Sequence, residues 1–326
     1  KGVTKDAVFR KGHVVTKEDI PVLLSVGKDQ LYVWEKEEGM LHENDGAEIL
    51  CAMCKGEHME RSQAKEGKIE LTAACDGLLK VDNKGLKAVN GFGQMMIATR
   101  HGNFAVKKGD KLAGTRIIPL VIEEEKMTKA KEAAMAATGN KPILNLLPFK
   151  HKKVGIVTTG NEVFYGRIKD TFTPVIEGKL AEFDTEIIDH VTWNDDDTKV
   201  TASILDMIHK GADIVVCTGG MSVDPDDCTP GAIMETGARI VSYGAPVLPG
   251  AMMLVSYYKN EEDGRIIPIL GLPGCVMYAK RTIFDLVLPR IVAGEILKKA
   301  DIDTLGEGGL CLNCPVCTFP NCGFGK

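Results

Sequence analysis

The chain has 326 residues, of which 44% are hydrophobic and 26% charged, an ordinary composition that excludes a fibrous or largely disordered protein. A single hydrophobic core usually stops growing at roughly 250 residues, so we predict more than one domain. The net charge of -5 and the pI near 5.9 argue against binding to nucleic acid or to anionic membranes, because both need a basic surface.

The sequence from Lys1 onward has no charged-then-apolar leader, and no apolar run reaches the roughly 18 residues needed to cross a bilayer. We therefore expect neither a secretory signal nor a membrane span. Ten cysteines are present, and four of them crowd between Cys311 and Cys322. This clustering indicates metal binding more than a disulfide framework, and hence a cytoplasmic location.

Residues 1–150 are predicted to form a β-rich mixed α+β domain. Short apolar segments such as KIELTAACDG and MMIATRHGNFAV are separated by glycine and charged turns, and several alternate with the two-residue period of a strand. EEEKMTKAKEAAMAATG, which ends at Gly139, is rich in helix formers and predicts an exposed helix with a glycine C-cap. Two prolines and a basic run then place a boundary near His151.

Residues 151–303 follow an alternating pattern that predicts an α/β domain of three layers. The apolar strands VGIVTTG, EIIDHVT, ADIVVCTGG and IIPILGLPG alternate with helical stretches, which is typical of a parallel sheet covered on both faces. Val200, Ile204 and Ile208 form the apolar stripe of one helix, and another is predicted from about Met277 to Leu297. The flexible GEGG sequence leads into a Cys-rich tail, residues 304–326.

Three loops follow the predicted strands: TTGNE, TGGMSVDPDDCTP and GLPG. In an open parallel sheet, ligands bind beyond the carboxyl ends of the strands, where free N–H groups at helix starts face anions. In the second loop Gly219 and Gly220 let backbone N–H groups approach a phosphate, and hydroxyl donors come from Thr218 and Ser222.

Acidic residues come directly after this anion cradle: Asp224, Asp226 and Asp227. They would repel a phosphate unless Mg²⁺ lay between, since hard cations take carboxylate and phosphate oxygens together. A metal-bridged phosphate or nucleotide is one prediction. The other is that these residues cap the next helix, near Thr229 and Pro230, and both roles are compatible on one loop.

The block ADIVVCTGGMSVDPDDCTPGAI resembles the signature loop of the molybdopterin-binding domain of molybdenum cofactor biosynthesis proteins. TTGNEVFYGRIKDT resembles the first loop of that family, and PILGLPGCVMYAKRTIFDLVLPRI resembles its closing loop and helix. Three motifs in the right order are far more specific than one glycine-rich turn.

This resemblance implies binding of molybdopterin, with Mg²⁺ and ATP or AMP, by a molybdopterin adenylyltransferase or a molybdenum insertase. It implies that Asp227 is the catalytic acidic residue and, with Asp226, a Mg²⁺ ligand. Judged from the residues alone, Asp170 is equally well a helix N-cap. The pocket residues implied are Thr159, Gly160, Asn161, Glu162, Asp170, Thr218, Gly219, Gly220, Ser222, Pro273 and Gly274.

Two positions depart from the family pattern. Cys275 stands where insertase-like members tend to have Asn, and PVLPGAMM lacks the Lys of their corresponding turn. Adenylyltransferases of the family are usually short single-domain proteins. The alternatives therefore include a non-catalytic carrier or sensor and an iron–sulfur electron-transfer protein. The expected partners are molybdopterin, molybdate and a molybdoenzyme apoprotein, and we expect a homo-oligomer.

The tail sequence CLNCPVCTFPNCGFGK separates its four cysteines by two, two and four residues: Cys311, Cys314, Cys317 and Cys322. This spacing is close to the bacterial ferredoxin run and predicts a [4Fe–4S] cluster, with structural Zn²⁺, and then disulfides or free thiols, as the alternatives. Cys51, Cys54, His58 and Cys75 offer a second set of ligands, but ILCAMC also fits a buried helix.

Overall fold

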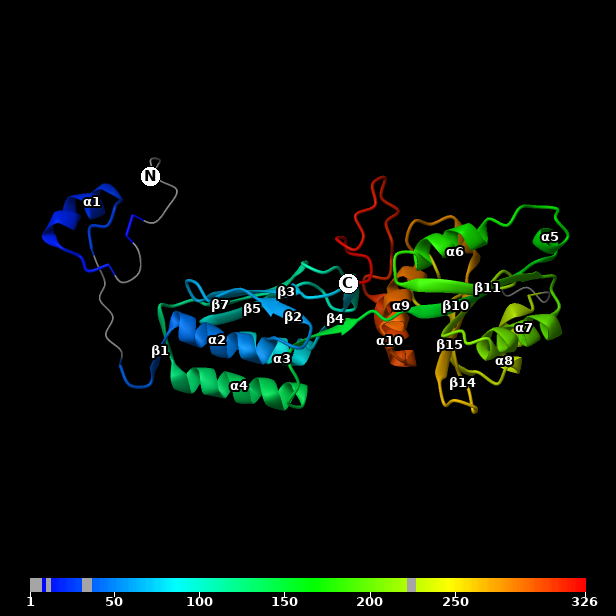
Figure 1. Cartoon of the computed structure of the whole chain (residues 1–326), viewed down its shortest axis with the longest axis horizontal. Helices are drawn as coiled ribbons and strands as arrows, with labels where there is room; N and C mark the ends of the chain where they lie inside the picture. Colours follow the sequence, from blue (N-terminus) through cyan, green and yellow to red (C-terminus); the bar gives the residue numbers. More distant parts are fainter. Residues whose placement is uncertain (1–7, 10–12, 31–36, 222–226) are drawn as a thin grey trace.

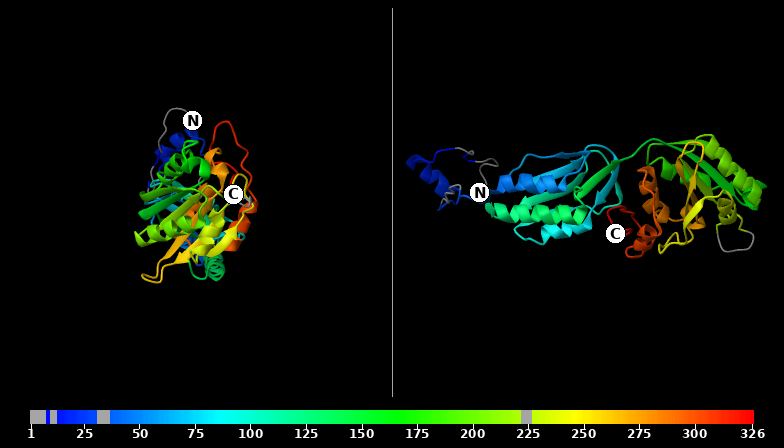
Figure 2. Two further views of the ribbon diagram at one scale, coloured as in Figure 1. Left: turned by 90° about the vertical axis from the view of Figure 1, so that its right-hand side faces the viewer. Right: turned by 90° about the horizontal axis from the view of Figure 1, so that it is seen from below.

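The computed structural model describes residues 8–9, 13–30, 37–221 and 227–326. Two halves follow one another along the long axis of the molecule, and the C-terminal tail lies near their junction (Figure 1, Figure 2). We call residues 40–148 the N-terminal half, residues 152–303 the C-terminal half and residues 304–326 the tail. Within the described ranges, no helix combines the length and the apolar character needed to cross a membrane.

The N-terminal half is a mixed α+β structure preceded by the short helical turns η1 (Lys17–Asp19) and α1 (Ile20–Ser25). Its larger sheet has the strand order β2-β3-β7-β5, a second sheet has the order β6-β4-β9, and β1 pairs with β8. The strands are β1 (Met40–His42), β2 (Met59–Arg61), β3 (Lys68–Ala73), β4 (Gly77–Val81), β5 (Met95–Thr99), β6 (Phe104–Val106), β7 (Lys111–Ile117), β8 (Val121–Glu123) and β9 (Leu144–Pro148).

Helices pack against the sheets of this half (Figure 1): α2 (Glu43–Cys54), α3 (Asn83–Asn90) and α4 (Glu124–Thr138). The predicted helix ending at Gly139 is confirmed as α4, and Gly139 is its left-handed C-cap at φ 63°. Cys51 and Cys54 lie on α2 in the core, where burial raises the pKa of the Cys54 thiol to about 12. The ILCAMC segment is therefore a buried part of a helix.

The C-terminal half contains a six-stranded sheet with the order β11-β10-β12-β15-β14-β13. Strands β11, β10, β12 and β15 are parallel, which confirms the predicted α/β class, whereas β14 and β13 add an antiparallel edge. The strands are β10 (Lys152–Thr159), β11 (Thr185–Trp193), β12 (Ile214–Thr218), β13 (Arg239–Tyr243), β14 (Leu254–Lys259) and β15 (Ile266–Leu272).

Successive residues of the central strands enter two different cores, as the two-residue period of a strand requires. Ile156, Val216 and Leu270 join one cluster with α6 and α9, whereas Val157, Val215 and Ile269 join another with α7 and α8. The sheet is thus covered on both faces, as predicted. The helical elements of this half are α5 (Asn161–Phe164), α6 (Phe172–Leu180), α7 (Asp197–His209), α8 (Thr229–Glu235), η2 (Gly274–Met277), α9 (Ile283–Val292) and α10 (Lys299–Asp303).

Helix α9 (Ile283–Val292) is shorter at both ends than the predicted helix from about Met277 to Leu297, which was wrong in its bounds. Thr282 and Asp285 form a capping box, because the Asp285 carboxylate accepts from the Thr282 amide at 2.7 Å. Lys179 on α6 donates to the same carboxylate at 2.7 and 2.8 Å. This buried ion pair joins α6 to the start of α9.

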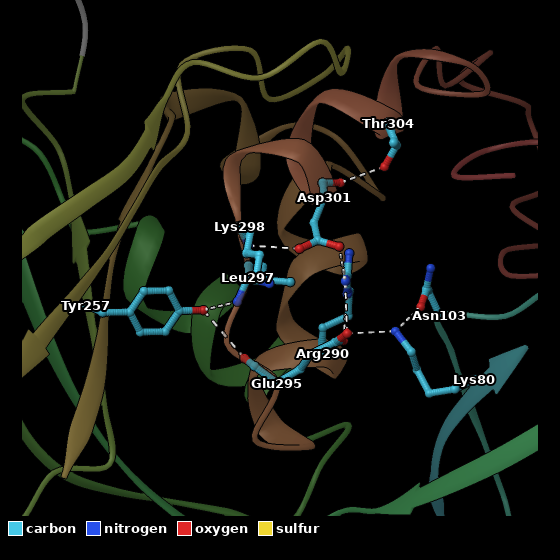
Figure 3. A network of polar contacts seen from close by, with 9 residues as sticks. All are labelled: Lys80, Asn103, Tyr257, Arg290, Glu295, Leu297, Lys298, Asp301 and Thr304. Carbon is cyan, nitrogen blue, oxygen red and sulfur yellow. Dashed lines mark hydrogen bonds and ion pairs between the residues drawn. The ribbon is translucent and has the colours of Figure 1, made fainter. Parts of the chain in front are cut away.

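A polar network connects the two halves (Figure 3). Lys80 of β4 donates to Glu295 at 2.7 Å, and Arg290 of α9 donates to the same carboxylate at 2.8 Å and to Asp301 at 2.9 Å. Burial raises the pKa of Glu295, but hydrogen bonds from Arg290 and Lys80 outweigh it and leave that pKa below its ordinary value. Phe104 of β6 also belongs to the core of the C-terminal half.

Candidate functional site

A cavity of about 670 Å³ opens at the carboxyl ends of the parallel strands, and we call it the loop cavity. Thr158 of β10 is paired with Thr218 of β12, which is paired in turn with Leu272 of β15. The three strands therefore end side by side, and their loops meet. Of the predicted site residues, those lining the cavity are Thr159, Gly160, Glu162, Gly219, Gly220, Asp227, Pro273 and Gly274.

The turn after β12 requires glycine because it approaches the end of β10 closely. Gly219 has φ +83°, and a Cβ there would lie 2.0 Å from the Thr159 carbonyl oxygen. Gly220 has φ +50°. Thr229 fixes the turn, since its hydroxyl donates to the Gly219 carbonyl at 2.8 Å and lies 2.9 Å from the Thr159 hydroxyl. The glycines thus bring two strand ends and the start of α8 together.

Buried polar atoms without a partner occur beside this turn. The Thr218 hydroxyl is fully buried, and neither it nor Oδ2 of Asp227 has a hydrogen-bond partner in the described structure. Oδ1 of Asn194, after β11, is in the same state. An unsatisfied buried polar group costs roughly 1–3 kcal/mol, so native proteins seldom keep several together. Asp227 lines the loop cavity, and a ligand there would be able to satisfy it.

The electrostatics of the loop cavity are acidic. Glu162 and Asp227 line it, and none of its described lining residues is Lys or Arg. Burial and the nearby Asp227 carboxylate raise the pKa of Tyr243, whose hydroxyl donates to the Met221 carbonyl at 3.3 Å. An anionic ligand would depend here on backbone N–H groups and on a cation placed against the carboxylates.

Asn161, Asp170 and Thr218 were predicted to lie in the pocket, but they are not among the residues lining it. The Asn161 amide donates to Asp195 at 2.6 Å, in the loop that leads to α7. The Asp170 carboxylate accepts from the amides of Phe172 and Thr173, the first two residues of α6, at 2.8 and 3.1 Å. It therefore stabilises the start of α6, although the N-cap residue is Thr171, one position after the predicted Asp170. Ser222, Asp224 and Asp226 lie outside the described residues.

Several residues that complete the wall of the loop cavity were not predicted from the sequence. The turn between β13 and β14 contributes Leu248, Pro249 and Met252. Ile168 before α6 and Phe172, the first residue of α6, complete the wall. These side chains carry no binding signature, and only the fold brings them to the strand ends. They make the outer wall apolar and aromatic, which suits a flat heterocycle whose polar end reaches the glycine turn.

The four tail cysteines lie apart from the glycine turn, around a second cavity of about 450 Å³. Pro249 and Cys275 line both cavities, so the two adjoin. Within the described residues, no three His, Cys, Asp or Glu side chains are grouped closely enough to hold a metal ion.

Comparison with known proteins identifies the segment that forms this site. Residues 155–293 match the family model described as a probable molybdopterin binding domain, and residues 1–35 match a domain of unknown function. A CinA-like protein of Mycobacterium tuberculosis is 34% identical over 77 residues, covering 24% of this chain and 18% of that protein. A CinA-like protein of Mycolicibacterium gilvum is 30% identical over 158 residues, covering 42% of this chain and 37% of that protein.

The chain therefore spans well under half the length of these curated relatives. Among solved structures, the tungsten cofactor synthesizing protein MoaB from Pyrococcus furiosus is 24% identical and covers 39% of this chain and 84% of its own, with a TM-score of 0.34.

Proposed function

Because residues 155–293 belong to the molybdopterin-binding domain family, we propose that the loop cavity binds molybdopterin or its adenylylated form in the course of cofactor biosynthesis. The observation that carries this proposal is the unpartnered, buried Oδ2 of Asp227 beside the Gly219 turn. The glycine turn suits the phosphate of the pterin, and the apolar wall suits its ring system.

Asp227 is proposed to hold Mg²⁺ against the phosphate, together with Asp226. The cavity supports this role because its described wall has two carboxylates and no basic side chain, so a phosphate needs a bridging cation. In adenylyl transfer, an oxygen of the pterin phosphate attacks the α-phosphorus of ATP, and pyrophosphate leaves with the bonding electrons. Asp227 would position the phosphates for that displacement.

Metal insertion is the second reaction proposed, in which molybdate is a substrate and the adenylylated pterin is consumed with release of AMP. A carrier or sensor would bind the same pterin without turnover. Two incubations of the full chain distinguish these three functions. Pyrophosphate release from molybdopterin, ATP and Mg²⁺ indicates adenylyl transfer. AMP release from the adenylylated pterin and molybdate indicates insertion. Binding with neither product would overturn the enzymatic proposal and leave the carrier.

The binding site itself is tested with Asp227→Asn and, as a matched control, Asp206→Asn, whose side chain is exposed on α7. Loss of a charged partner costs about 1.5–3 kcal/mol, so Mg²⁺-dependent molybdopterin affinity should fall roughly 10- to 150-fold in the first variant only. Without Mg²⁺, Asp227→Asn should bind at least as well as the wild type, because a repulsive charge is gone. Equal Mg²⁺-dependent affinity in both variants would refute the role of Asp227.

Further parts of the proposal concern the whole chain. The remaining predicted pocket residues act with Asp227, and Asn161 and Asp170 support the loops from behind. The tail binds an iron–sulfur cluster or Zn²⁺. Each chain consists of three parts, residues 1–150, 151–303 and 304–326. The protein is a cytoplasmic homo-oligomer and passes its product to a molybdoenzyme apoprotein. Size measurement in solution tests the oligomer.

A further inference from the structure

Five cysteines line the cavity beside the loop cavity, and we call it the thiol cavity. Its thiols come from two separate parts of the chain: Cys275, in the η2 turn after β15, and the four cysteines of the tail. Spacing along the tail alone does not indicate the fifth thiol. Tertiary structure therefore places a remote cysteine in the wall of the same cavity as the CxxCxxC sequence.

The tail is held in this position by hydrogen bonds to the loops after β13 and β15. The Leu248 amide donates to the Gly309 carbonyl and the Cys311 amide to the Leu248 carbonyl, each at 2.8 Å. Lys280, which follows η2, donates to the Pro315 carbonyl at 3.0 Å. The segment carrying Cys314 and Cys317 is thus tied to the chain that carries Cys275.

Two cations line the same cavity: Lys280 and Arg281. Arg281 is paired with Asp285 at 2.8 Å and with Glu182 at 2.9 Å, and it also lies over the ring of Phe319, 5.0 Å from its centroid. Lys280 donates to the Pro315 carbonyl and, among the described residues, forms no ion pair with a carboxylate. A metal held by four thiolates carries net negative charge, which a neighbouring ammonium stabilises.

We propose that Cys275 is a ligand of a metal centre completed by Cys311, Cys314 and Cys317. In the ferredoxin run that this spacing resembles, the fourth cysteine of the run serves another cluster, so a centre takes its last ligand from elsewhere in the chain. Cys275 is the thiol that the fold supplies as the fourth ligand of this centre. This inference rests on the metal-binding tail proposed above and deepens it.

Binding of the metal requires the tail to close, because the thiols are not yet grouped around one point. Residues 311–326 contain no helix or strand, so closure breaks no regular structure. Gly274 and Cys275 also line the loop cavity, and a metal at Cys275 would fix that part of its wall. The metal centre is therefore adjacent to the pterin site.

The test uses the full chain under anaerobic conditions with two probes, Zn²⁺ alone and iron with sulfide. Metal content per chain and visible absorbance are compared for wild type, Cys275→Ser, Cys314→Ser and the control Cys75→Ser in the N-terminal half. Mutation of a residue that only hydrogen-bonds to a metal ligand already lowers the affinity for the metal about 10- to 100-fold. For the metal that the wild type retains, the affinity of Cys275→Ser and of Cys314→Ser should fall by at least that factor. The affinity of Cys75→Ser should equal that of the wild type.

Wild-type metal content in Cys275→Ser, or no binding of either probe by the wild type, would overturn the inference. Alkylation of the wild type guards against a variant that fails to fold: bound metal should protect Cys275 together with the three tail thiols, and modification of Cys275 in loaded protein would also overturn it. Molybdopterin binding by the wild type is measured in parallel. A wild type that binds the pterin but neither metal refutes this inference and the metal-binding tail, and one that binds metal but no pterin refutes only the proposed pterin site.

Discussion

Gly219→Ala is the sharpest test of the glycine turn. The added Cβ would lie 2.0 Å from the Thr159 carbonyl oxygen and 2.9 Å from the Thr159 hydroxyl oxygen. Because the nearest atom belongs to the backbone of β10, the strand end or the turn must move. Gly237→Ala is a matched control, since Gly237 has nearly the same φ, +84° against +83°, and nothing within 4 Å of its Cβ position.

Both substitutions place an alanine in left-handed backbone, but only Gly219→Ala also causes a steric overlap. Left-handed backbone costs an L residue roughly 1–2 kcal/mol, which applies to both. Overpacking adds about 1–3 kcal/mol and applies only at Gly219. We therefore expect Gly219→Ala to destabilise the C-terminal half by roughly 2–5 kcal/mol and Gly237→Ala by roughly 1–2 kcal/mol.

Urea unfolding followed by tryptophan fluorescence measures this difference. The chain has two tryptophans, so a Trp34→Phe background leaves only Trp193, which lies in β11 of the same sheet. Gly219→Ala should unfold at lower urea than Gly237→Ala. Equal midpoints would mean that the turn absorbs a side chain freely, and the close approach of the two strand ends would then not be required.

Two further predictions concern ion pairs of the C-terminal half. Asp285→Asn leaves Lys179 buried without its charged partner and should cost roughly 3–5 kcal/mol in urea unfolding, whereas a loss no larger than that of exposed Asp206→Asn would contradict the pair's role. The pKa of Glu295 is depressed in the folded state, so its stabilisation is complete above its ordinary value of 4.5 and is lost as the pH falls through the lower folded-state value. Thermal unfolding of Glu295→Gln should lose less stability on acidification than the wild type, and identical acid profiles would argue against the Lys80 and Arg290 contacts.

Much of the fold was predictable from local signals. Helix formers before Gly139 predicted α4, and the stripe Val200, Ile204 and Ile208 predicted α7, because both patterns are complete within one segment. The antiparallel strands β13 and β14 were not predicted. Strand direction depends on which neighbour a strand meets, and the residues of the strand do not encode that by themselves.

The candidate site was predictable to a similar extent. The loops after β10, β12 and β15 were identified correctly as neighbours, since the carboxyl ends of parallel strands share one edge of the sheet. The direction of the Asn161 side chain was not predicted: it donates to Asp195, the partner nearest to it. Asp170 accepts from the first amides of α6, close to the helix-start role that the sequence offered as the alternative to a pocket role.

By itself the sequence determined where the backbone needs glycine, which strands alternate with helices, and how the tail cysteines are spaced. These features depend on residues close together in the chain. Only the tertiary structure decided that Leu248 and Phe172 line the loop cavity and that Cys275 lines one cavity with the tail cysteines. Such contacts join segments far apart in sequence, and packing of the whole domain, not any local pattern, brings them together.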